Sequence, residues 1–368
     1  MALNCGIVGL PNVGKTTIFS ALTATPAETA NYQFSTIKPN LGVIQVPDSR
    51  LAKLSELFKP QRTIPASIEF VDISGLVKGS SRGEGLGNQF LSHIREVGVI
   101  AHVVRCFDDP DIIHVSDRID PASDIDTINV ELALADLETL QKRRDRAERA
   151  LRVQGKAEQR AAEAVLHILS RLEAALEQGK PARTVELTEE EQEAVYDCHF
   201  ITMKPLLYVC NVNEKGLTDN PYVDTVLRIA AEEGTEGVVI CGKFEAELTG
   251  IPDEAERLAF LADLGMAESG LGALVHAAYR LLGLSTFFTV GPDECRAWTI
   301  HNGATAPKAA GIIHSDLERG FIKAEVYSFE DMQLYGSESR IKEAGKYRLE
   351  GKDYLVKDGD VLFIKFNV

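Results

Sequence analysis

Eight residues near the start of the chain have the spacing of a phosphate-binding loop. Gly9 to Thr16 read G-L-P-N-V-G-K-T, which fits the pattern G-x-x-x-x-G-K-[ST]. Glycines allow backbone conformations that turn successive N–H groups toward one point, and the positive end of a following helix attracts anions to the same place. Lys15 is placed to reach the β- and γ-phosphates, and the Thr16 hydroxyl to bind Mg²⁺. The pattern predicts a site for a nucleoside triphosphate.

The residues expected to contact the nucleotide run from the centre of this loop into the following helix, and they are Asn12, Val13, Gly14, Lys15, Thr16 and Thr17. Asn12 also raises a hypothesis about a second cation. An amide at this position could help to hold K⁺ beside the phosphates, where it would stabilise developing negative charge. This hypothesis rests on the residue type alone.

Two further segments have residues suited to sensing the γ-phosphate. Asp72-Ile73-Ser74-Gly75 has the form D-x-x-G at the end of an apolar run. We expect the Asp72 carboxylate to hold Mg²⁺ through water and the Gly75 N–H to bond the γ-phosphate. Glycines recur from position 75 to 87, which is typical of a loop whose conformation follows nucleotide state. Thr36, between the two motifs, is the candidate to complete the Mg²⁺ shell.

The segment expected to recognise the base is Asn211-Val212-Asn213-Glu214. GTPases carry N-K-x-D there, and the Asp accepts two hydrogen bonds from guanine. Glu214 is one methylene longer and Val212 replaces the lysine, so the preference for guanine should be lost. Asn211 can still address the N7 and N6 edge of a purine. These residues favour ATP, with GTP or a relaxed site as the alternatives.

Leu76 stands directly after D-x-x-G, where Ras-like enzymes carry the glutamine that orients the attacking water. A leucine side chain can neither donate nor accept, so we expect slow hydrolysis unless another group supplies this function. His93 and His114 are the candidates, and His114 is favoured because its segment is rich in Asp and Pro. The predicted catalytic set is therefore His114, Lys15 and Gly75.

The elements that must position these residues alternate along the chain. Short apolar runs, separated for the most part by amphipathic stretches, occupy 3–10, 41–46, 68–73, 97–107, 205–212 and 237–242. This alternation predicts an α/β fold, a parallel sheet with helices on both faces. We assign a P-loop NTPase domain of the G type to residues 1–125 and 201–283.

Residues 126–200 interrupt the alternation with two amphipathic stretches joined by a Gly-containing turn, which predicts an inserted helical coiled-coil hairpin. Its apolar positions follow steps of three and four, beginning Ala133, Leu137, Leu140 and resuming at Ala162, Val165, Leu169. Its tip, residues 142–160, has eight Lys or Arg against three Asp or Glu. A solvated helical face and a contact with RNA or the ribosome both stay open.

From residue 284 the sequence becomes rich in short β-type runs and Gly or Pro turns, which predicts a small β-rich domain at 284–368. The whole chain of 368 residues has a net charge of −16, which argues against a general nucleic-acid coat. No apolar run approaches the roughly 18 residues of a spanning helix, and the first residues lack the basic region of a signal peptide. We expect a cytoplasmic protein with no membrane contact and no sequence-specific DNA partner.

The six cysteines form no C-x-x-C pair and mostly lie in apolar runs, so we expect buried, reduced thiols and no zinc site. They are Cys5, Cys106, Cys198, Cys210, Cys241 and Cys295.

Together these segments resemble the YchF family of Obg-like ATPases, within the translation-factor class of P-loop proteins. GLPNVGKTT, EFVDISGLVKGSSRGEGLGNQFL, NVNE, the hairpin and the C-terminal RAWTI to IKFNV all fit, so the resemblance covers nearly the whole chain. It implies that residues 284–368 form a TGS domain, a small β-grasp-like module. It also implies a preference for ATP, slow Mg²⁺-dependent hydrolysis, association with the ribosome or its RNA, and a role in translation or stress regulation.

Two departures from the family pattern are Ser35, where some relatives have cysteine, and Cys241-Gly242-Lys243 on the base side. Two other functions remain as alternatives. One is a GTPase of ribosome assembly with relaxed base contacts, and the other is a scaffold that holds a nucleotide without hydrolysing it.

Overall fold

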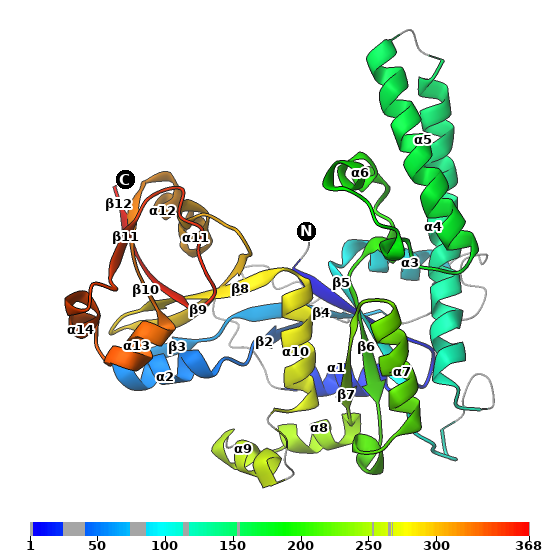
Figure 1. Cartoon of the computed structure of the whole chain (residues 1–368). Coiled ribbons are helices and arrows are strands. Elements are labelled where there is room, and N and C mark those ends of the chain that lie inside the picture. The colour runs from blue at the N-terminus through cyan, green and yellow to red at the C-terminus, as the bar shows by residue number, and fades with distance from the viewer. Residues whose placement is uncertain are drawn as a thin grey trace. The chain divides into compact units, whose positions relative to one another are not determined.

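The chain separates into two units, shown in a computed structural model that describes residues 3–24, 41–73, 86–112, 118–152, 155–251, 254–263, 266 and 268–367 (Figure 1). The first unit holds Met1–Thr25, Asn31–Gly42 and Glu69–Leu274, and the second holds Pro26–Ala30, Val43–Ile68 and Val275–Val368. Among the described residues, no helix combines the length and the apolarity needed to span a bilayer.

The first sheet has six strands in the order β2-β4-β1-β5-β6-β7. They are β1 (Asn4–Val8), β2 (Leu41–Gln45), β4 (Ser67–Asp72), β5 (Val99–Arg105), β6 (Leu206–Asn211) and β7 (Glu236–Ile240). The strand β1 pairs in parallel with β4 and β5, and β6 does so with β5 and β7. Every residue of β5 and β6 is buried, as in central strands that are covered on both faces. The predicted parallel α/β fold is confirmed.

Helices flank this sheet (Figure 1). They are α1 (Lys15–Thr23), α3 (Leu86–Glu96), α7 (Pro221–Glu232), α8 (Gly242–Thr249), α9 (Glu254–Asp263) and α10 (Gly270–Leu281). Of these, α1, α3 and α7 connect its strands, and α8, α9 and α10 follow its last strand, β7. Because parallel strands share a direction, the carboxyl ends of β1, β4, β5 and β6 lie along one edge. The phosphate loop follows β1 at this edge, and the proposed base motif follows β6.

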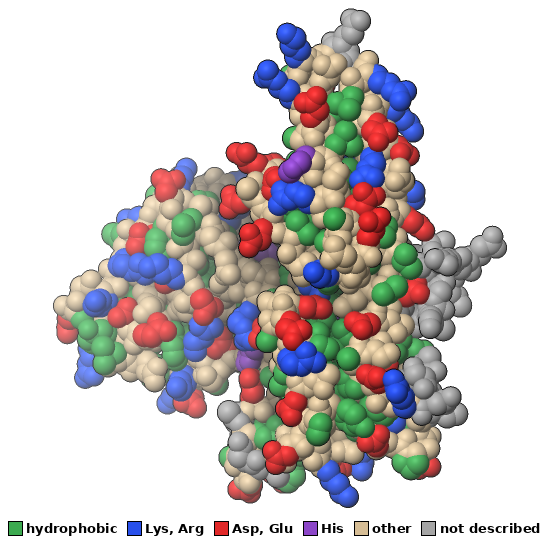
Figure 2. Space-filling model, turned by 45° about the vertical axis from the view of Figure 1, so that its right-hand side comes forward, with side chains coloured by type: hydrophobic (Ala, Val, Ile, Leu, Met, Phe, Trp, Pro, Cys, Tyr) green, Lys and Arg blue, Asp and Glu red, His purple; other side chains and the backbone are tan. Residues whose placement is uncertain are grey.

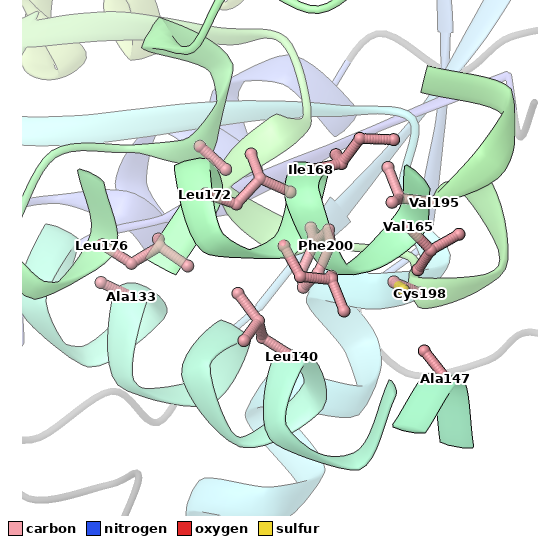
Figure 3. Packing of buried hydrophobic residues seen from close by; sticks show 12 residues of the cluster. Ala133, Leu140, Ala147, Val165, Ile168, Leu172, Leu176, Val195, Cys198 and Phe200 are labelled. Atoms are coloured by element: carbon pink, nitrogen blue, oxygen red, sulfur yellow. The ribbon is translucent and has the colours of Figure 1, made fainter. Parts of the chain in front are cut away.

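The predicted hairpin is present as α4 (Pro121–Ala150) and α5 (Lys156–Glu177), which pack along each other. Its first helix begins at Pro121, because Asp120 accepts a hydrogen bond from the Ser123 N–H as an N-cap and proline fits the first turn. Predicted positions of both helices lie in the buried seam: Ala133, Leu140, Ala147, Val165, Leu169, Leu172 and Leu176. Figure 3 labels all of these side chains except Leu169 and shows them in one cluster.

The base of the hairpin is tied to the rest of the first unit by buried polar groups. The Asp136 carboxylate on α4 is fully buried and accepts bonds from the backbone N–H groups of Ile201 (2.8 Å) and Thr202 (2.7 Å). It also accepts from the Thr202 hydroxyl at 2.7 Å. From α3, the Arg95 guanidinium donates to the Thr139 hydroxyl of α4 at 3.0 Å. These bonds fix the position of the hairpin base against the rest of the first unit.

The second unit is built on another six-stranded sheet, in the order β11-β10-β12-β8-β9-β3. Its strands are β3 (Arg62–Ile64), β8 (Leu284–Val290), β9 (Glu294–His301), β10 (Phe321–Ser328), β11 (Arg348–Glu350) and β12 (Asp360–Phe366). Its helices are α2 (Ser49–Phe58), α11 (Ala306–Ile313), α12 (Ser315–Arg319), α13 (Phe329–Tyr335) and α14 (Glu338–Glu343). The β-rich segment predicted from residue 284 begins where β8 begins, at Leu284.

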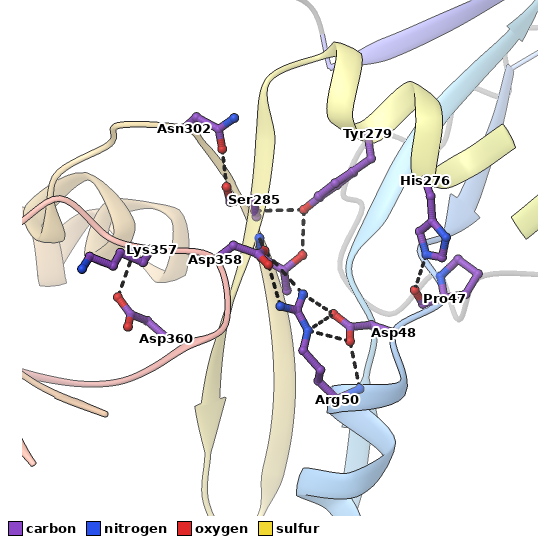
Figure 4. A network of polar contacts seen from close by, with 11 residues as sticks. Pro47, Asp48, Arg50, His276, Tyr279, Ser285, Asn302, Lys357, Asp358 and Asp360 are labelled. Atoms are coloured by element: carbon purple, nitrogen blue, oxygen red, sulfur yellow. Dashed lines mark hydrogen bonds and ion pairs between the residues drawn. The ribbon is translucent and has the colours of Figure 1, made fainter. Parts of the chain in front are cut away.

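Two segments distant in the chain meet in this unit. The strand β3 adds to the edge of the sheet by pairing in parallel with β9. The Arg50 guanidinium at the start of α2 binds Asp48 (2.8 Å) and, from the loop before β12, Asp358 (2.6 Å), as Figure 4 shows. The elements α2 and β3 therefore pack with residues 275–368, although the ends of the same segment contribute to β2 and β4 of the first sheet. The boundaries 1–125 and 201–283, 126–200 and 284–368 stay a prediction.

Candidate nucleotide-binding site

The phosphate loop joins β1 to α1 through backbone conformations that favour glycine. Gly9 has φ 155° and Gly14 has φ 93°, and Asn12 adopts φ 63°, a region that asparagine tolerates better than most residues. A Cβ on Gly9 would lie 2.5 Å from the Val103 carbonyl oxygen, and one on Gly14 would lie 2.1 Å from the Asn211 Nδ2. Both glycines are thus required by conformation and by space.

The N-terminus of α1 presents the functional side chains of this loop. Thr16 and Thr17 are exposed there, as is Asn12 before them, whereas the Val13 side chain is buried. Val13 can therefore offer only its backbone to a ligand. The helix has Gly14 as its N-cap with no side-chain cap, so its first N–H groups stay available to an anion.

Lys15 is partly buried, and its ammonium donates to the Leu10 carbonyl oxygen at 2.7 Å across the loop. Burial lowers the pKa of Lys15, and attraction to Asp72 partly offsets that effect. The Lys15 side chain is thus folded back onto the loop, where its ammonium interacts electrostatically with the Asp72 carboxylate.

Asp72 ends β4 beside the loop, because its Cα pairs with Ile7 of β1. The Asp72 side chain is 7% exposed. A carboxylate and the Thr16 hydroxyl are hard oxygen donors of the kind that Mg²⁺ prefers, with phosphates and waters as its other ligands. Within the described ranges no group of three or more His, Cys, Asp or Glu is arranged to hold a metal ion. The donor set fits a magnesium ion brought by a nucleotide.

Asn211, at the end of β6, joins the base motif to the phosphate loop. Its side-chain Nδ2 donates to the Val13 carbonyl oxygen at 2.9 Å, and its Oδ1 accepts from the Gly242 N–H at 3.3 Å. One N–H of the amide remains for a purine N7 or for another acceptor. The position of this amide is therefore set jointly by the loop and by α8.

The other two base residues differ in exposure. Val212 is 3% exposed, so its side chain is part of the core and does not face a ligand. Glu214 is exposed, and its carboxylate lies 3.4 Å from the ammonium of Lys243 on α8. An exposed ion pair of this kind is weak, but it gives the carboxylate a partner other than a base.

Four of the predicted residues lie outside the described part of the chain. They are Thr36, Gly75, Leu76 and His114, together with most of the Gly-rich segment 75–87. His93, the less favoured histidine, is exposed on α3. The structure thus brings together the phosphate loop, Asp72 and Asn211, and it does not test the proposed catalytic set.

Arg105, at the end of β5, is a residue that the sequence reasoning missed. Its guanidinium is buried and donates to the carbonyl oxygens of Phe107 (3.1 Å), Asp109 (3.1 Å) and Ile112 (3.0 Å). Such a charge is costly to bury unless it is fully hydrogen-bonded. It therefore shapes the loop beside Asn211, its neighbour on β6. In the sequence, the feature that could have indicated this role is the single arginine at the end of the apolar residues Val103 and Val104.

All six cysteines are free and buried, as predicted. Burial raises the pKa of the Cys5, Cys198, Cys241 and Cys295 thiols, and the pKa of Cys106 is raised first by its hydrogen bond with Cys210 and then by burial. These side chains therefore stay in the unreactive protonated form.

Two family models match the chain. The model described as a 50S ribosome-binding GTPase matches residues 4–136, and YchF-GTPase_C, described as a protein of unknown function, matches residues 284–367.

The chain is also similar over its full length to characterised sequences. The "Ribosome-binding ATPase YchF" of Bacillus subtilis (strain 168) is 53% identical over 373 residues, and that of Haemophilus influenzae is 52% identical over 368, each match covering 100% of both chains. The structure of the Schizosaccharomyces pombe YchF GTPase matches with a TM-score of 0.88 and 36% identity, covering 99% of this chain and 97% of that one. A GTP binding protein from Pyrococcus horikoshii, 18% identical with a TM-score of 0.60, shares the fold.

Proposed function

The chain belongs to the YchF family, and on that basis we propose that it is an ATPase that binds the ribosome and switches conformation with its nucleotide. The observation that carries the proposal is the phosphate loop, with its left-handed backbone at Gly9, Asn12 and Gly14, in a chain whose full-length relatives are named ribosome-binding ATPases.

In the proposed reaction, Lys15 neutralises charge on the β- and γ-phosphates, and the N–H groups of residues 12–17 cradle them. Thr16, Thr36 and, through water, Asp72 would hold Mg²⁺, which would supply positive charge to offset the charge that develops on the phosphates. Gly75 bonds the γ-phosphate, and His114 orients the attacking water in place of the glutamine missing at Leu76. Hydrolysis is slow because no stronger group replaces that glutamine.

Adenine is the proposed base because of Glu214. Its carboxylate is longer than the aspartate of N-K-x-D and is paired with Lys243, so it does not supply the acceptor that guanine needs. The second candidate is a GTPase of ribosome assembly, which is favoured by the match of residues 4–136 to a ribosome-binding GTPase model and by the similarity to the Schizosaccharomyces pombe YchF GTPase. The third is a scaffold that binds a nucleotide without hydrolysis, which the residue Leu76 favours.

Turnover and base choice are tested together. We expect purified protein to release phosphate from MgATP over many turnovers, slowly, with GTP a poorer substrate. Lys15→Ala should abolish release, and a rate in Na⁺ equal to that in K⁺ would reject the Asn12 hypothesis. Release of phosphate from GTP faster than from ATP would favour the GTPase, and tight binding without any release would favour the scaffold.

The proposed partner is the ribosome or its RNA. The candidate contact regions are the hairpin tip, residues 142–160, and the C-terminal domain. Co-sedimentation with purified ribosomes at increasing salt tests this, because contacts to phosphates weaken as salt rises. Absence of binding at low salt, in every nucleotide state, would contradict it.

A further inference from the structure

The second unit contains a cavity that the proposed function does not use. Its volume is about 510 Å³, which is within the range of small-molecule sites. The walls come from the start of α2 and the loop before it, from α10, from β8, and from Asn302 and Asp358. Every residue that lines the cavity belongs to this unit, so the site lies within one body of the protein.

One wall of the cavity holds two carboxylates and a single guanidinium. Arg50 binds Asp48 at 2.8 Å and Asp358 at 2.6 Å, and Figure 4 shows it between the two carboxylates. Two carboxylates against one guanidinium leave this wall with a net charge of −1. The Asp358 side chain is 52% exposed, so its oxygens keep lone pairs for a donor in the cavity. The ion pairs hold this acidic wall in place before any ligand arrives.

The helix α10 supplies a cation to the same cavity. Arg280, in the last turn of this helix, is exposed and lines the cavity. Arg280 also interacts within the protein, but a guanidinium has five N–H donors, and its exposure leaves room for a further acceptor. The helix is fixed to the other walls, because His276 Nε2 donates to the Pro47 carbonyl oxygen at 2.7 Å and the Tyr279 hydroxyl to that of Ser285 at 3.0 Å.

Two neutral groups add hydrogen-bonding capacity that the protein does not use. The Ser49 hydroxyl has no hydrogen-bond partner among the described residues. The Asn302 side chain uses its Oδ1, which accepts from the Ser285 hydroxyl, and its Nδ2 has no partner in the same part of the chain. The cavity therefore offers donors and acceptors on walls whose positions are already set, as small-molecule sites do.

The distribution of charge decides which class of ligand fits. A simple anion such as phosphate would be repelled by the acidic wall, and a metal ion would be repelled by Arg50 and Arg280. Figure 2 shows Lys and Arg side chains interspersed with Asp and Glu over the surface of this unit, so the surroundings do not concentrate ions of one sign. A zwitterion satisfies both walls, because its two opposite charges are carried on one small molecule.

We propose that this cavity binds a free α-amino acid, with its ammonium group on the Asp48–Arg50–Asp358 wall and its carboxylate on Arg280. A planar guanidinium matches a carboxylate with two parallel hydrogen bonds. The remaining volume takes the side chain of the amino acid, and the neutral groups bind its other polar atoms. The site is distinct from the nucleotide site, and the proposal holds or fails independently of the proposed function.

The probes are the twenty proteinogenic L-amino acids, each titrated by calorimetry into the full-length protein. At least one should bind saturably, at one site per chain, with a Kd below about 1 mM. Its amide lacks the carboxylate and its N-acetyl derivative lacks the ammonium, so each should bind at least about tenfold more weakly. Absence of saturable binding for all twenty, or equal affinity of the derivatives, would overturn the proposal. Displacement of the amino acid by an equal concentration of inorganic phosphate would do so as well.

The variant Arg280→Gln separates this site from any other. It should weaken binding of the amino acid by at least about tenfold and leave the affinity of the amide unchanged, because the amide has no carboxylate for Arg280 to bind. The matched control is Arg340→Gln, which removes an exposed arginine from α14 of the same unit and should leave both affinities unchanged. Equal weakening in the two variants, or in neither, would contradict the assignment to this cavity.

Discussion

At Gly14 both the backbone conformation and the surrounding space exclude a side chain. A Cβ there would lie 2.1 Å from the Asn211 Nδ2, so Gly14→Ala must push away the amide that links the loop to the base motif. We expect ATP affinity to fall by on the order of 100-fold, or about 2.7 kcal/mol, in calorimetric titration.

The control is Gly179→Ala, which has a similar φ of 73° but no neighbouring atom within 4 Å. It should cost about 1 kcal/mol of stability from the strained backbone and leave ATP affinity unchanged. Equal ATP affinity in the wild type and in Gly14→Ala would show that the loop is not the binding element.

The choice between adenine and guanine also depends on a single residue, Glu214. Glu214→Asp shortens the carboxylate and breaks its pair with Lys243, so it should move the ratio of ATP to GTP affinity toward GTP. The single change is easier to interpret than a double change with Val212→Lys, because Val212 is buried and a lysine there would also disturb the core. Lys243→Ala, which breaks the pair without shortening the carboxylate, is the comparison. An unchanged ratio in Glu214→Asp would refute the argument from carboxylate length.

Within the first sheet, His102 of β5 makes the stability of the fold depend on pH. It is buried beside Tyr208 of β6, and its Nδ1 has no hydrogen-bond partner among the described residues. Burial, with smaller effects of Arg183 and Lys15, lowers the pKa of His102 to about 3. The unfolded chain binds this proton near pH 6.5 and the folded chain does not. The contribution to stability is therefore complete above about pH 6.5 and is lost as the pH falls toward 3.

Urea unfolding at pH 7 and at pH 5.5 measures this effect. From pH 7 to pH 5.5 the unfolding free energy of the wild type should fall by about 1 kcal/mol more than that of His102→Phe, because the variant lacks the titrating group. His167→Gln, on the exposed side of α5, should keep the wild-type dependence. A His102→Phe variant that retains the full loss would show that other groups cause it.

The elements were predictable where local pattern determines them. Steps of three and four fixed both hairpin helices, and unbroken apolar runs gave β5 and β6, because central parallel strands are buried on both faces. The start of α4 at Pro121 depends on Asp120 as the cap and on a proline in the first turn, which the spacing of apolar positions does not mark. The buried role of Arg105 depends on carbonyl groups of a folded loop, which no spacing rule encodes.

Across the whole molecule, the assignment of residues 43–68 could not be read from the sequence. The two ends of this segment contribute to β2 and β4 of the parallel sheet, whereas its middle joins the C-terminal part through the pairing of β3 with β9, the bonds of Arg50 and the packing of α2 against β8 and β9. Contacts of this kind connect residues 308 positions apart, as between Arg50 and Asp358. Local periodicity carries no information about them.

Arg50→Met tests this long-range junction. It leaves Asp48, whose side chain is 10% exposed, without its cation, so we expect the unfolding free energy of the second unit to fall by about 2 kcal/mol. Arg62→Met breaks a more exposed pair with Glu294 in the same unit and should cost less than about 1 kcal/mol. Hydrogen exchange of residues 275–367 reports the change, and equal protection in the two variants would contradict the role given to Arg50.

Calorimetric titration with MgATP tests the central claim, that the loop from Gly9 to Thr16 binds a nucleoside triphosphate. We expect saturable heat for one site per chain, weaker binding of MgGTP, and no heat with Lys15→Ala. Absence of heat with both nucleotides in a folded wild-type protein, or an undiminished signal from Lys15→Ala, would contradict it.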